Sequence, residues 1–330
     1  MFGLLALECM VIVALFVAIG LARRAYALPR AAKESVFWAL GLFLWGGLIA
    51  TFGAAYLTDV GEYLAASYIP ETQKSLFAAA VLAPLTEETT KGLAVLLALE
   101  WNRREVPSLL DGMLYGALVG LGFEATENIL YILSFYLENG FWGVTLYGSA
   151  RVFAFGFTHA LFTSLTGLGV ALARLLWPSP WSVLALPLGW LAAVILHMTH
   201  NVLVSASNLL CWGALFFDVA GLYLVWKLAR LLSQQERAWV RRYLWEEFEQ
   251  GLITWKQYQT ACTQEGRRTA LRLARNPQQA KRIQSFYRAL VQLAVEKAKA
   301  DMVWIPGQRR RIRALRQRIR RWAPHMPDAS

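Results

Sequence analysis

Seven long apolar stretches constrain this chain more than any other feature of its sequence. A helix needs about 20 mostly apolar residues to span a bilayer. The stretches that meet this condition lie at roughly 2–22, 36–57, 74–99, 109–136, 148–176, 183–207 and 209–231. Hydrophobic residues make up 57% of the 330 residues, which is more than a soluble domain normally carries. The excess is expected to face lipid, so the sequence predicts an all-α, polytopic transmembrane bundle of about seven spans.

The apolar pattern ends near residue 231, and this change predicts two domains. Residues 1–231 form the expected transmembrane domain, whereas residues 232–330 are polar and rich in arginine. Aromatic residues recur at helical spacing between 239 and 248. Thr254 with Gln257 three residues later is typical of a helix start. The tail is therefore predicted to be a small, basic helical domain.

The short loops carry lysine and arginine on one side only. These basic residues are Arg23, Arg24, Arg30, Lys33, Arg103, Arg104, Arg174, Lys227 and Arg230. The opposite loops, 59–71 and 137–146, contain no lysine or arginine. Because positively charged loops stay in the cytoplasm, we predict an N-terminus outside and a cytoplasmic tail. A cleaved signal peptide is disfavoured, since the basic pair at 23–24 follows the first apolar run.

The segment 309–322 is a basic run with Ile312, Leu315 and Ile319 on one helical face. It is compatible with a helix on anionic lipid headgroups, where each basic residue contributes about 1 kcal/mol. A solvated helix is the alternative. No nucleic-acid partner is expected, because no other feature of the sequence favours one.

Ionisable residues interrupt the apolar stretches, and each costs about 2.5–3.5 kcal/mol or more at the bilayer centre. The stretch 74–99 contains Glu87, Glu88 and, one turn beyond Glu87, Lys91. The structural interpretation of this group is a buried ion pair that holds the helix in register. Two adjacent carboxylates with a lysine are difficult to explain by packing alone, which favours a functional site.

The stretch 109–136 carries glycines at 112, 116 and 120, followed on the same face by polar residues. The glycine spacing predicts close approach of another helix. Continuing the stripe places Glu124, Glu127 and Asn128 towards the interior of the bundle. A role in helix association suits Asn128 better than the two carboxylates.

Histidines occur in the next two apolar stretches. His159 lies in 148–176, and a lone histidine there is often a satisfied hydrogen-bonding residue. The stretch 183–207 offers His197 and Asn201 on one polar face, with His200 one turn from His197 and off to the side. At a rise of 1.5 Å per residue, Glu87 falls near the bilayer midplane. Glu127, His159 and His197 fall somewhat to the outer side of the midplane. A shared site in the outer half of the membrane is therefore predicted.

Hydrolysis of an amide is the chemistry that this set of residues favours. It requires an activated water, stabilisation of the oxyanion and an acid for the leaving amine. Glu87 or Glu88 suits the role of base. His159, His197 and Glu127 could hold a divalent metal such as zinc, or the histidines could orient water without a metal. Asn201 would supply an uncharged donor.

The same residues resemble the motifs of the PrsW family of intramembrane proteases. The similar elements are Glu87-Glu88-x-x-Lys91, Gly122-Phe123 through Glu127-Asn128, Phe155-x-x-x-His159 and His197-x-x-x-Asn201. The family is related to the CaaX prenyl endopeptidases and the bacterial CPBP proteins. The resemblance implies a catalytic Glu87-Glu88 pair with essential His159 and His197. It also implies a location in a bacterial inner or cell membrane and a single-pass substrate, such as an anti-sigma factor, cut near its outer membrane boundary. Glu124 and His200 have no assigned counterpart.

Three alternatives use the same residues. A CaaX-type peptidase would act at a different membrane face, which the outward depth disfavours. An ion or proton-coupled transporter also lines its pathway with glutamate and histidine, but internal repeats with broken helices are not evident here. A haem-binding bundle would leave the glutamates unexplained.

Overall fold

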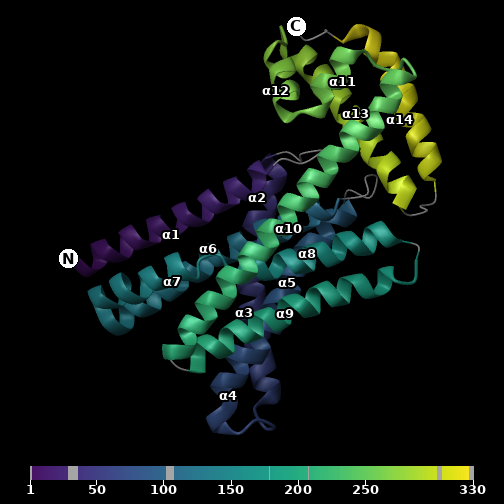
Figure 1. The fold of residues 1–330 in the computed structure, drawn as a ribbon. Helices are drawn as coiled ribbons and strands as arrows, with labels where there is room; N and C mark the ends of the chain where they lie inside the picture. The colour runs from purple at the N-terminus through teal and green to yellow at the C-terminus, as the bar shows by residue number, and fades with distance from the viewer. Residues whose placement is uncertain are drawn as a thin grey trace. The chain divides into compact units, whose positions relative to one another are not determined.

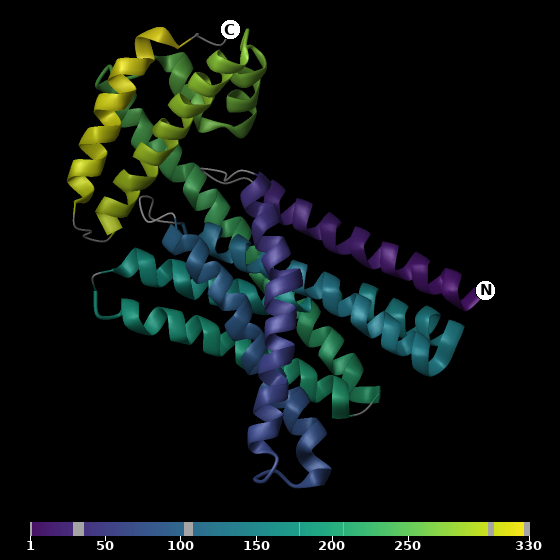
Figure 2. The same cartoon turned by 180° about the vertical axis from the view of Figure 1, so that it is seen from behind.

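The computed structural model describes residues 2–28, 36–101, 108–177, 179–206, 208–302 and 307–326, and every regular element in these ranges is helical (Figures 1 and 2). The all-α prediction is confirmed. The chain divides into two compact units, Met1–Ala27 with Ser35–Ala229 and Leu28–Glu34 with Arg230–Ser330. Four of the basic loop residues, Arg30, Lys33, Arg103 and Arg104, lie outside the described residues.

Within the described residues, five segments are long and apolar enough to cross a membrane, namely Phe2–Ala27, Val36–Ala65, Leu109–Leu176, Ser182–Ala206 and Leu209–Glu249. The expected number of about seven is not confirmed. The two stretches expected at 109–136 and 148–176 fall within one 68-residue segment. The stretch expected at 74–99 is helical but carries Glu87, Glu88 and Lys91, too many charges for an apolar window of that length.

The first unit is built from helices that include three π-helical turns. In chain order they are α1 (Phe2–Ala27), α2 (Val36–Leu44), η1 (Trp45–Ala50), α3 (Thr51–Ala65), α4 (Glu71–Phe77), η2 (Ala78–Leu82), α5 (Ala83–Trp101), α6 (Leu109–Trp142), η3 (Gly143–Gly148), α7 (Ser149–Ala154), α8 (Thr158–Leu176), α9 (Ser182–Ala206) and α10 (Asn208–Glu249). α6 packs on α8, and α8 packs on α9, so these helices lie side by side (Figure 1). The division between the two units falls within α10.

The glycine stripe of α6 forms its contact with α8. A Cβ added to Gly116 would lie 2.1 Å from the carbonyl oxygen of Thr163, and one added to Gly120 would lie 2.2 Å from that of His159. A Cβ added to Gly112 would lie 2.3 Å from the carbonyl oxygen of Gly167. Larger residues would push the helices apart, and the predicted close approach is confirmed.

The chain turns between α6 and α7 without an irregular loop. Gly140 interrupts α6 with φ of 57°, a conformation that glycine adopts readily. The following η3 packs back on α6, and a Cβ on Gly143 would lie 2.0 Å from the carbonyl oxygen of Phe135. Much of the expected outer loop 137–146 is therefore helical.

The π-helical turn η1 is hydrogen-bonded to both α5 and α6. Thr126 of α6 donates a hydrogen bond to the Gly47 carbonyl at 2.7 Å. Thr90 of α5 donates to the Ala50 carbonyl at 3.2 Å, and its own carbonyl accepts from the Trp45 indole at 3.3 Å. These three hydrogen bonds join η1 to both α5 and α6.

The second unit has a hydrophobic core of its own. Besides the end of α10 it contains α11 (Trp255–Cys262), α12 (Gln264–Arg272), α13 (Pro277–Met302), α14 (Gln308–Trp322) and η4 (Ala323–His325). Thr254 and Gln257 form the predicted capping box at the start of α11. Ile312, Leu315 and Ile319 of α14 pack against this core. The apolar face of the basic helix is thus covered by protein, which leaves its arginine face outermost.

Candidate active site

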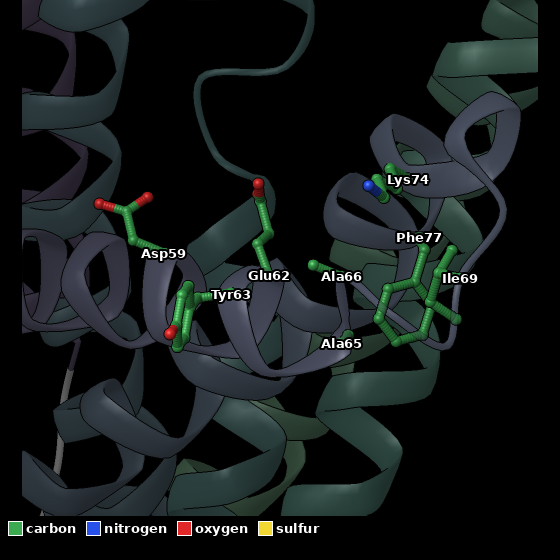
Figure 3. Close-up of a pocket in the computed structure, with 8 residues that line it drawn as sticks. All are labelled: Asp59, Glu62, Tyr63, Ala65, Ala66, Ile69, Lys74 and Phe77. Carbon is green, nitrogen blue, oxygen red and sulfur yellow. The ribbon is translucent and has the colours of Figure 1, made fainter.

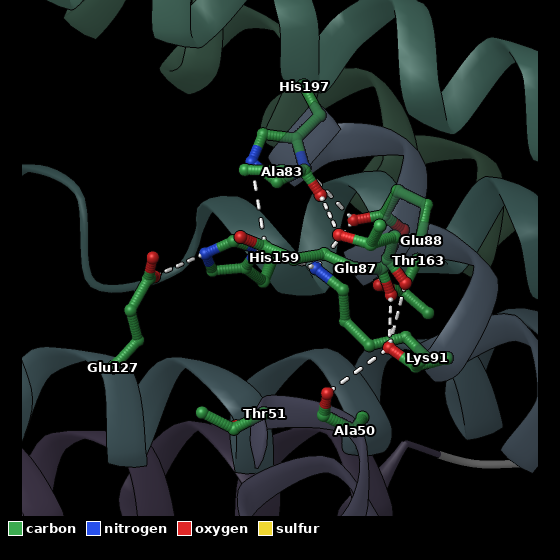
Figure 4. A network of polar contacts seen from close by, with 12 residues as sticks. Ala50, Thr51, Ala83, Glu87, Glu88, Lys91, Glu127, His159, Thr163 and His197 are labelled. Carbon is green, nitrogen blue, oxygen red and sulfur yellow. Dashed lines mark hydrogen bonds and ion pairs between the residues drawn. The ribbon is translucent and has the colours of Figure 1, made fainter. Parts of the chain in front are cut away.

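A cluster of charged side chains lies where α5, α6, α8 and α9 meet (Figure 4). Its members are Glu87, Glu88 and Lys91 from α5, Glu124 and Glu127 from α6, His159 from α8 and His197 from α9. The side chains of Glu88, Lys91 and Glu124 are fully buried. The structure thus brings together acidic and imidazole groups that the sequence places on four separate helices.

Each histidine of the cluster is held by a carboxylate through one ring nitrogen. Nε2 of His159 donates to Glu127 at 2.6 Å, and Nδ1 of His197 donates to Glu88 at 3.2 Å. Because a carboxylate only accepts hydrogen bonds, these contacts identify the ring nitrogens that carry the proton. The lone pairs of His159 Nδ1 and His197 Nε2 therefore remain for other partners.

Both of these remaining nitrogens face the same oxygen of Glu87. His159 Nδ1 and His197 Nε2 each lie 3.8 Å from Glu87 Oε2. The three ligand atoms lie within 4.8 Å of one another. Two imidazole nitrogens and one carboxylate oxygen, with the other ring nitrogens bound to carboxylates, are the donors typical of a catalytic zinc site.

The two adjacent glutamates differ in how completely they are paired. Glu88 accepts from Lys91 at 2.6 Å and from Thr163 at 3.0 Å, in addition to its bond from His197. Glu87 contacts Lys91 at 3.4 Å, and its side chain keeps 12% of its surface exposed. Glu87 is therefore the more available carboxylate of the pair.

The Lys91 ammonium already occupies part of the donor set around Glu87. It donates to His159 Nδ1 at 2.8 Å and lies 4.1 Å from the centre of the Phe123 ring. A metal bound to His159 would replace this hydrogen bond, while Lys91 would keep its closer pair with Glu88. A cation in this position indicates that the donor set suits a positive charge, so the residues fit a metal ion.

A second set of possible ligands, Glu124, Glu127 and His159, also comes within 4.8 Å. Arg151 of α7 pairs with both carboxylates of this set, at 3.3 Å with Glu124 and more closely with Glu127. The guanidinium also donates to Asn128 at 2.9 Å. Arg151 thus compensates the negative charge of these two acids, whereas no arginine pairs with the Glu87 set among the described residues. Glu127, which we expected as a metal ligand, is a member of this second set and hydrogen-bonds Nε2 of His159.

Arg151 was not singled out from the sequence, although it is a half-buried basic residue within an apolar stretch. Its guanidinium also lies 4.7 Å from the ring centre of Tyr131. A charged side chain at this depth in the bilayer is costly. That cost is the feature of the sequence by which Arg151 could have been identified.

A break between α7 and α8 determines where His159 lies. The chain leaves helical geometry over 155–157, and α8 begins at Thr158. At this new helix start, the His159 backbone N–H and the Thr158 hydroxyl both donate to Glu124 at 3.3 Å. Glu124 therefore anchors the first turn of α8 and, with it, the His159 ring.

The remaining predicted residues lie at the edge of the cluster. Asn201 donates to the Ala79 carbonyl in the π-turn η2 at 2.7 Å. His200 donates to Asp218 of α10 at 2.7 Å.

A cavity at the expected outer loop 59–71 is separate from this cluster (Figure 3). It has a volume of about 350 Å³ and is lined by Asp59, Glu62, Tyr63, Ala65, Ala66, Ile69, Lys74 and Phe77. None of these lining residues belongs to the Glu/His cluster. The Glu/His cluster is therefore the candidate active site on the basis of its acidic and imidazole side chains, and not because a cavity marks it.

Apolar helices around a buried carboxylate and imidazole centre define an integral membrane protein with a site suited to hydrolysis. A family model described as the PrsW family of intramembrane metalloproteases matches residues 34–229, and the chain belongs to this family. The resemblance in the sequence is thereby confirmed, and the chain is a peptidase. Searches of curated proteins and of solved structures each return no match to this chain.

Proposed function

We propose that this protease hydrolyses a peptide bond of a membrane protein substrate at the site formed by Glu87, His159 and His197. The observation that carries the proposal is the position of Glu87 Oε2, which lies 3.8 Å from one unprotonated nitrogen of each histidine. In both rings the opposite nitrogen is bound by a carboxylate. Such outer carboxylates fix the ring orientation of metal-binding histidines.

Glu87, His159 and His197 would hold the metal that the family description implies. When bound there, a divalent ion supplies Lewis-acid activation of water and of the scissile carbonyl. Glu87 is the partly exposed carboxylate of the pair, so it is the acid that meets the water. It either holds the water beside a metal or accepts its proton directly.

Glu88, Glu127 and Lys91 support these three residues. Glu88 and Glu127 orient the two imidazoles through their protonated nitrogens. Lys91 is fully buried between Glu88 and His159. A fixed ammonium in a dry site stabilises negative charge that develops on the substrate carbonyl oxygen.

The substrate proposed is a single-pass membrane protein of the anti-sigma-factor type, cut near the outer membrane boundary. The outward depth of Glu127, His159 and His197 in their helices supports this position of the cut. An N-terminus outside and a cytoplasmic tail in a bacterial cell membrane follow from the same orientation. The transmembrane domain would comprise residues 1–231, with residues 74–208 bearing the site, and the tail residues 232–330.

The tail is proposed to contact anionic lipid headgroups through the arginine face of α14. The exposed residues of this face are Arg309, Arg310, Arg313, Arg318, Arg320 and Arg321. The apolar face of α14 is used by its own unit. Attraction to the membrane would therefore be electrostatic and would weaken as salt is added.

The site is tested by co-expressing the chain with a tagged single-pass substrate. Glu87→Gln, His159→Ala and His197→Ala should each lower cleavage at least about a thousandfold, since they remove groups that act as a unit. Glu138→Gln is the matched control, because Glu138 lies on α6 and is exposed. Equal membrane levels of all variants must be shown by immunoblot. Undiminished cleavage by any of the three would refute the assignment, and chelation of purified enzyme tests the metal.

A further inference from the structure

Asp218 is a buried carboxylate outside the proposed active site. It lies on α10 with no exposed surface, and its Oδ2 accepts from His200 Nδ1 at 2.7 Å. Its Oδ1 has no hydrogen-bond partner in the described part of the chain. A half-satisfied acid within an apolar bundle is costly, so this pair requires an explanation beyond helix packing.

The ring of His200 links this carboxylate to the site. It is buried, and its centroid lies 5.4 Å from that of Phe155 and 5.9 Å from that of Phe162. Phe155 stands at the break that begins α8 and so helps to place His159. His200 therefore packs against side chains that border both imidazoles of the site.

Phe162 is the direct neighbour of His197. The two rings are stacked, with centroids 4.9 Å apart and an interplanar angle of 19°. Phe162 is completely buried and also meets His159 edge-on at 6.1 Å. Among the described residues, one hydrogen bond, to Glu88, holds the His197 ring. The stacked Phe162 adds a second restraint on the plane of the ring.

α10 supplies no side chain to the Glu/His cluster within the described residues, yet it lies close to α8. A Cβ on Gly221 would come within 2.8 Å of the Leu161 side chain. Val225 packs against the cluster of Leu161, Phe162 and Ala193. The helix is thus near enough to influence Phe162 through more than one contact.

We propose that Asp218 and His200 are positioning residues for the active site. Their hydrogen bond fixes the His200 ring, the ring holds Phe162, and Phe162 holds His197 in the plane that points Nε2 at Glu87. The inference rests on the proposed function, because His197 acts there as a metal ligand. Asp218 does not touch the reacting atoms.

The test compares Asp218→Leu with Asp218→Asn in purified full-length enzyme, counted per folded molecule. Asp218→Leu should lower kcat about tenfold with KM within about twofold, and should weaken zinc affinity about tenfold in a chelator competition. Asp218→Asn should stay within about threefold of the parent, because its amide oxygen still accepts from His200. Val219→Ala is the matched control, since Val219 lies beside Asp218 on α10 but is half exposed, and it should leave kcat and zinc affinity unchanged.

A double variant keeps the test decisive if Asp218→Leu folds poorly. His200→Phe combined with Asp218→Leu removes the polar pair but retains a ring against Phe162, so it should recover kcat to within about threefold.

The inference is overturned if folded Asp218→Leu matches the parent in kcat and zinc affinity. It is also overturned if Val219→Ala is equally impaired, or if Asp218→Asn is as impaired as Asp218→Leu. Retained cleavage by His197→Ala would instead overturn the proposed function.

Discussion

Two buried charge clusters, one in each compact unit, differ in how completely their groups are paired. In the second unit, Glu247 accepts from Arg316 at 2.6 and 3.0 Å and from Lys297 at 2.8 Å. In the first unit, Glu87 has one lysine at 3.4 Å and two imidazole nitrogens at 3.8 Å. The saturated cluster holds helices together, whereas the unsaturated one leaves Glu87 and Nε2 of His197 available for water or a metal.

The largest expected effect is a loss of cleavage without a loss of stability when Glu87 is replaced. Glu87→Gln is expected to abolish cleavage while leaving the melting temperature of the detergent-solubilised protein unchanged or slightly raised, because an incompletely paired buried charge is removed. Thermal unfolding and substrate cleavage are measured on the same preparation. A Glu87→Gln variant that is both inactive and clearly less stable would contradict the view that Glu87, unlike Glu247, has no structural role.

Glu247→Ala should show the opposite behaviour. Removing the carboxylate leaves Lys297 and Arg316 without their acid, which should cost about 3 kcal/mol of stability in the second unit. The value is at the low end for a buried pair because the Arg316 side chain is 37% exposed. Limited proteolysis of the full chain should then cut within α11–α14 faster, and an unchanged cutting rate would argue against a structural role.

Arg151→Gln tests whether the paired acids Glu124 and Glu127 support the position of His159. Without the guanidinium, Glu124 and Glu127 repel each other and Glu127 no longer holds His159 in one orientation. Cleavage should fall about 10- to 100-fold, as is typical for outer-sphere supports of a metal site. Arg151→Lys, which keeps the charge but not the forked geometry, should retain more activity. Equal loss in both would point to a role for the fork itself.

Thr163→Val should give the smallest change. It removes one of the three donors to Glu88, and a hydrogen bond of this kind contributes about 1 kcal/mol. Cleavage should therefore fall about fivefold. Thr199→Val is a suitable control, because the exposed Thr199 donates only to its own helix at Ile195. A loss greater than that of Arg151→Gln would contradict the minor role of Thr163.

Spacing in the sequence was enough to predict the helices and several of their contact faces. The stripe of Gly112, Gly116 and Gly120 predicted the close contact with another helix because a helical period places these residues on one face. The number of spans was less predictable, since charges in α5 and the turn at Gly140 alter what counts as a separate apolar segment. Asp218 escaped notice because its partner, His200, is on another helix.

By itself, the sequence determined that apolar helices would carry glutamates and histidines into the bundle, because residue type and a 3.6-residue period suffice for that. Only the tertiary structure decided that Glu87, not Glu127, shares its oxygen with both imidazoles, and that Arg151 joins the site. The reason is geometric. Which ring nitrogen faces which acid depends on helix rotation, side-chain rotamers and the break at 155–157, and shifts of about 1 Å in these exchange one partner for another.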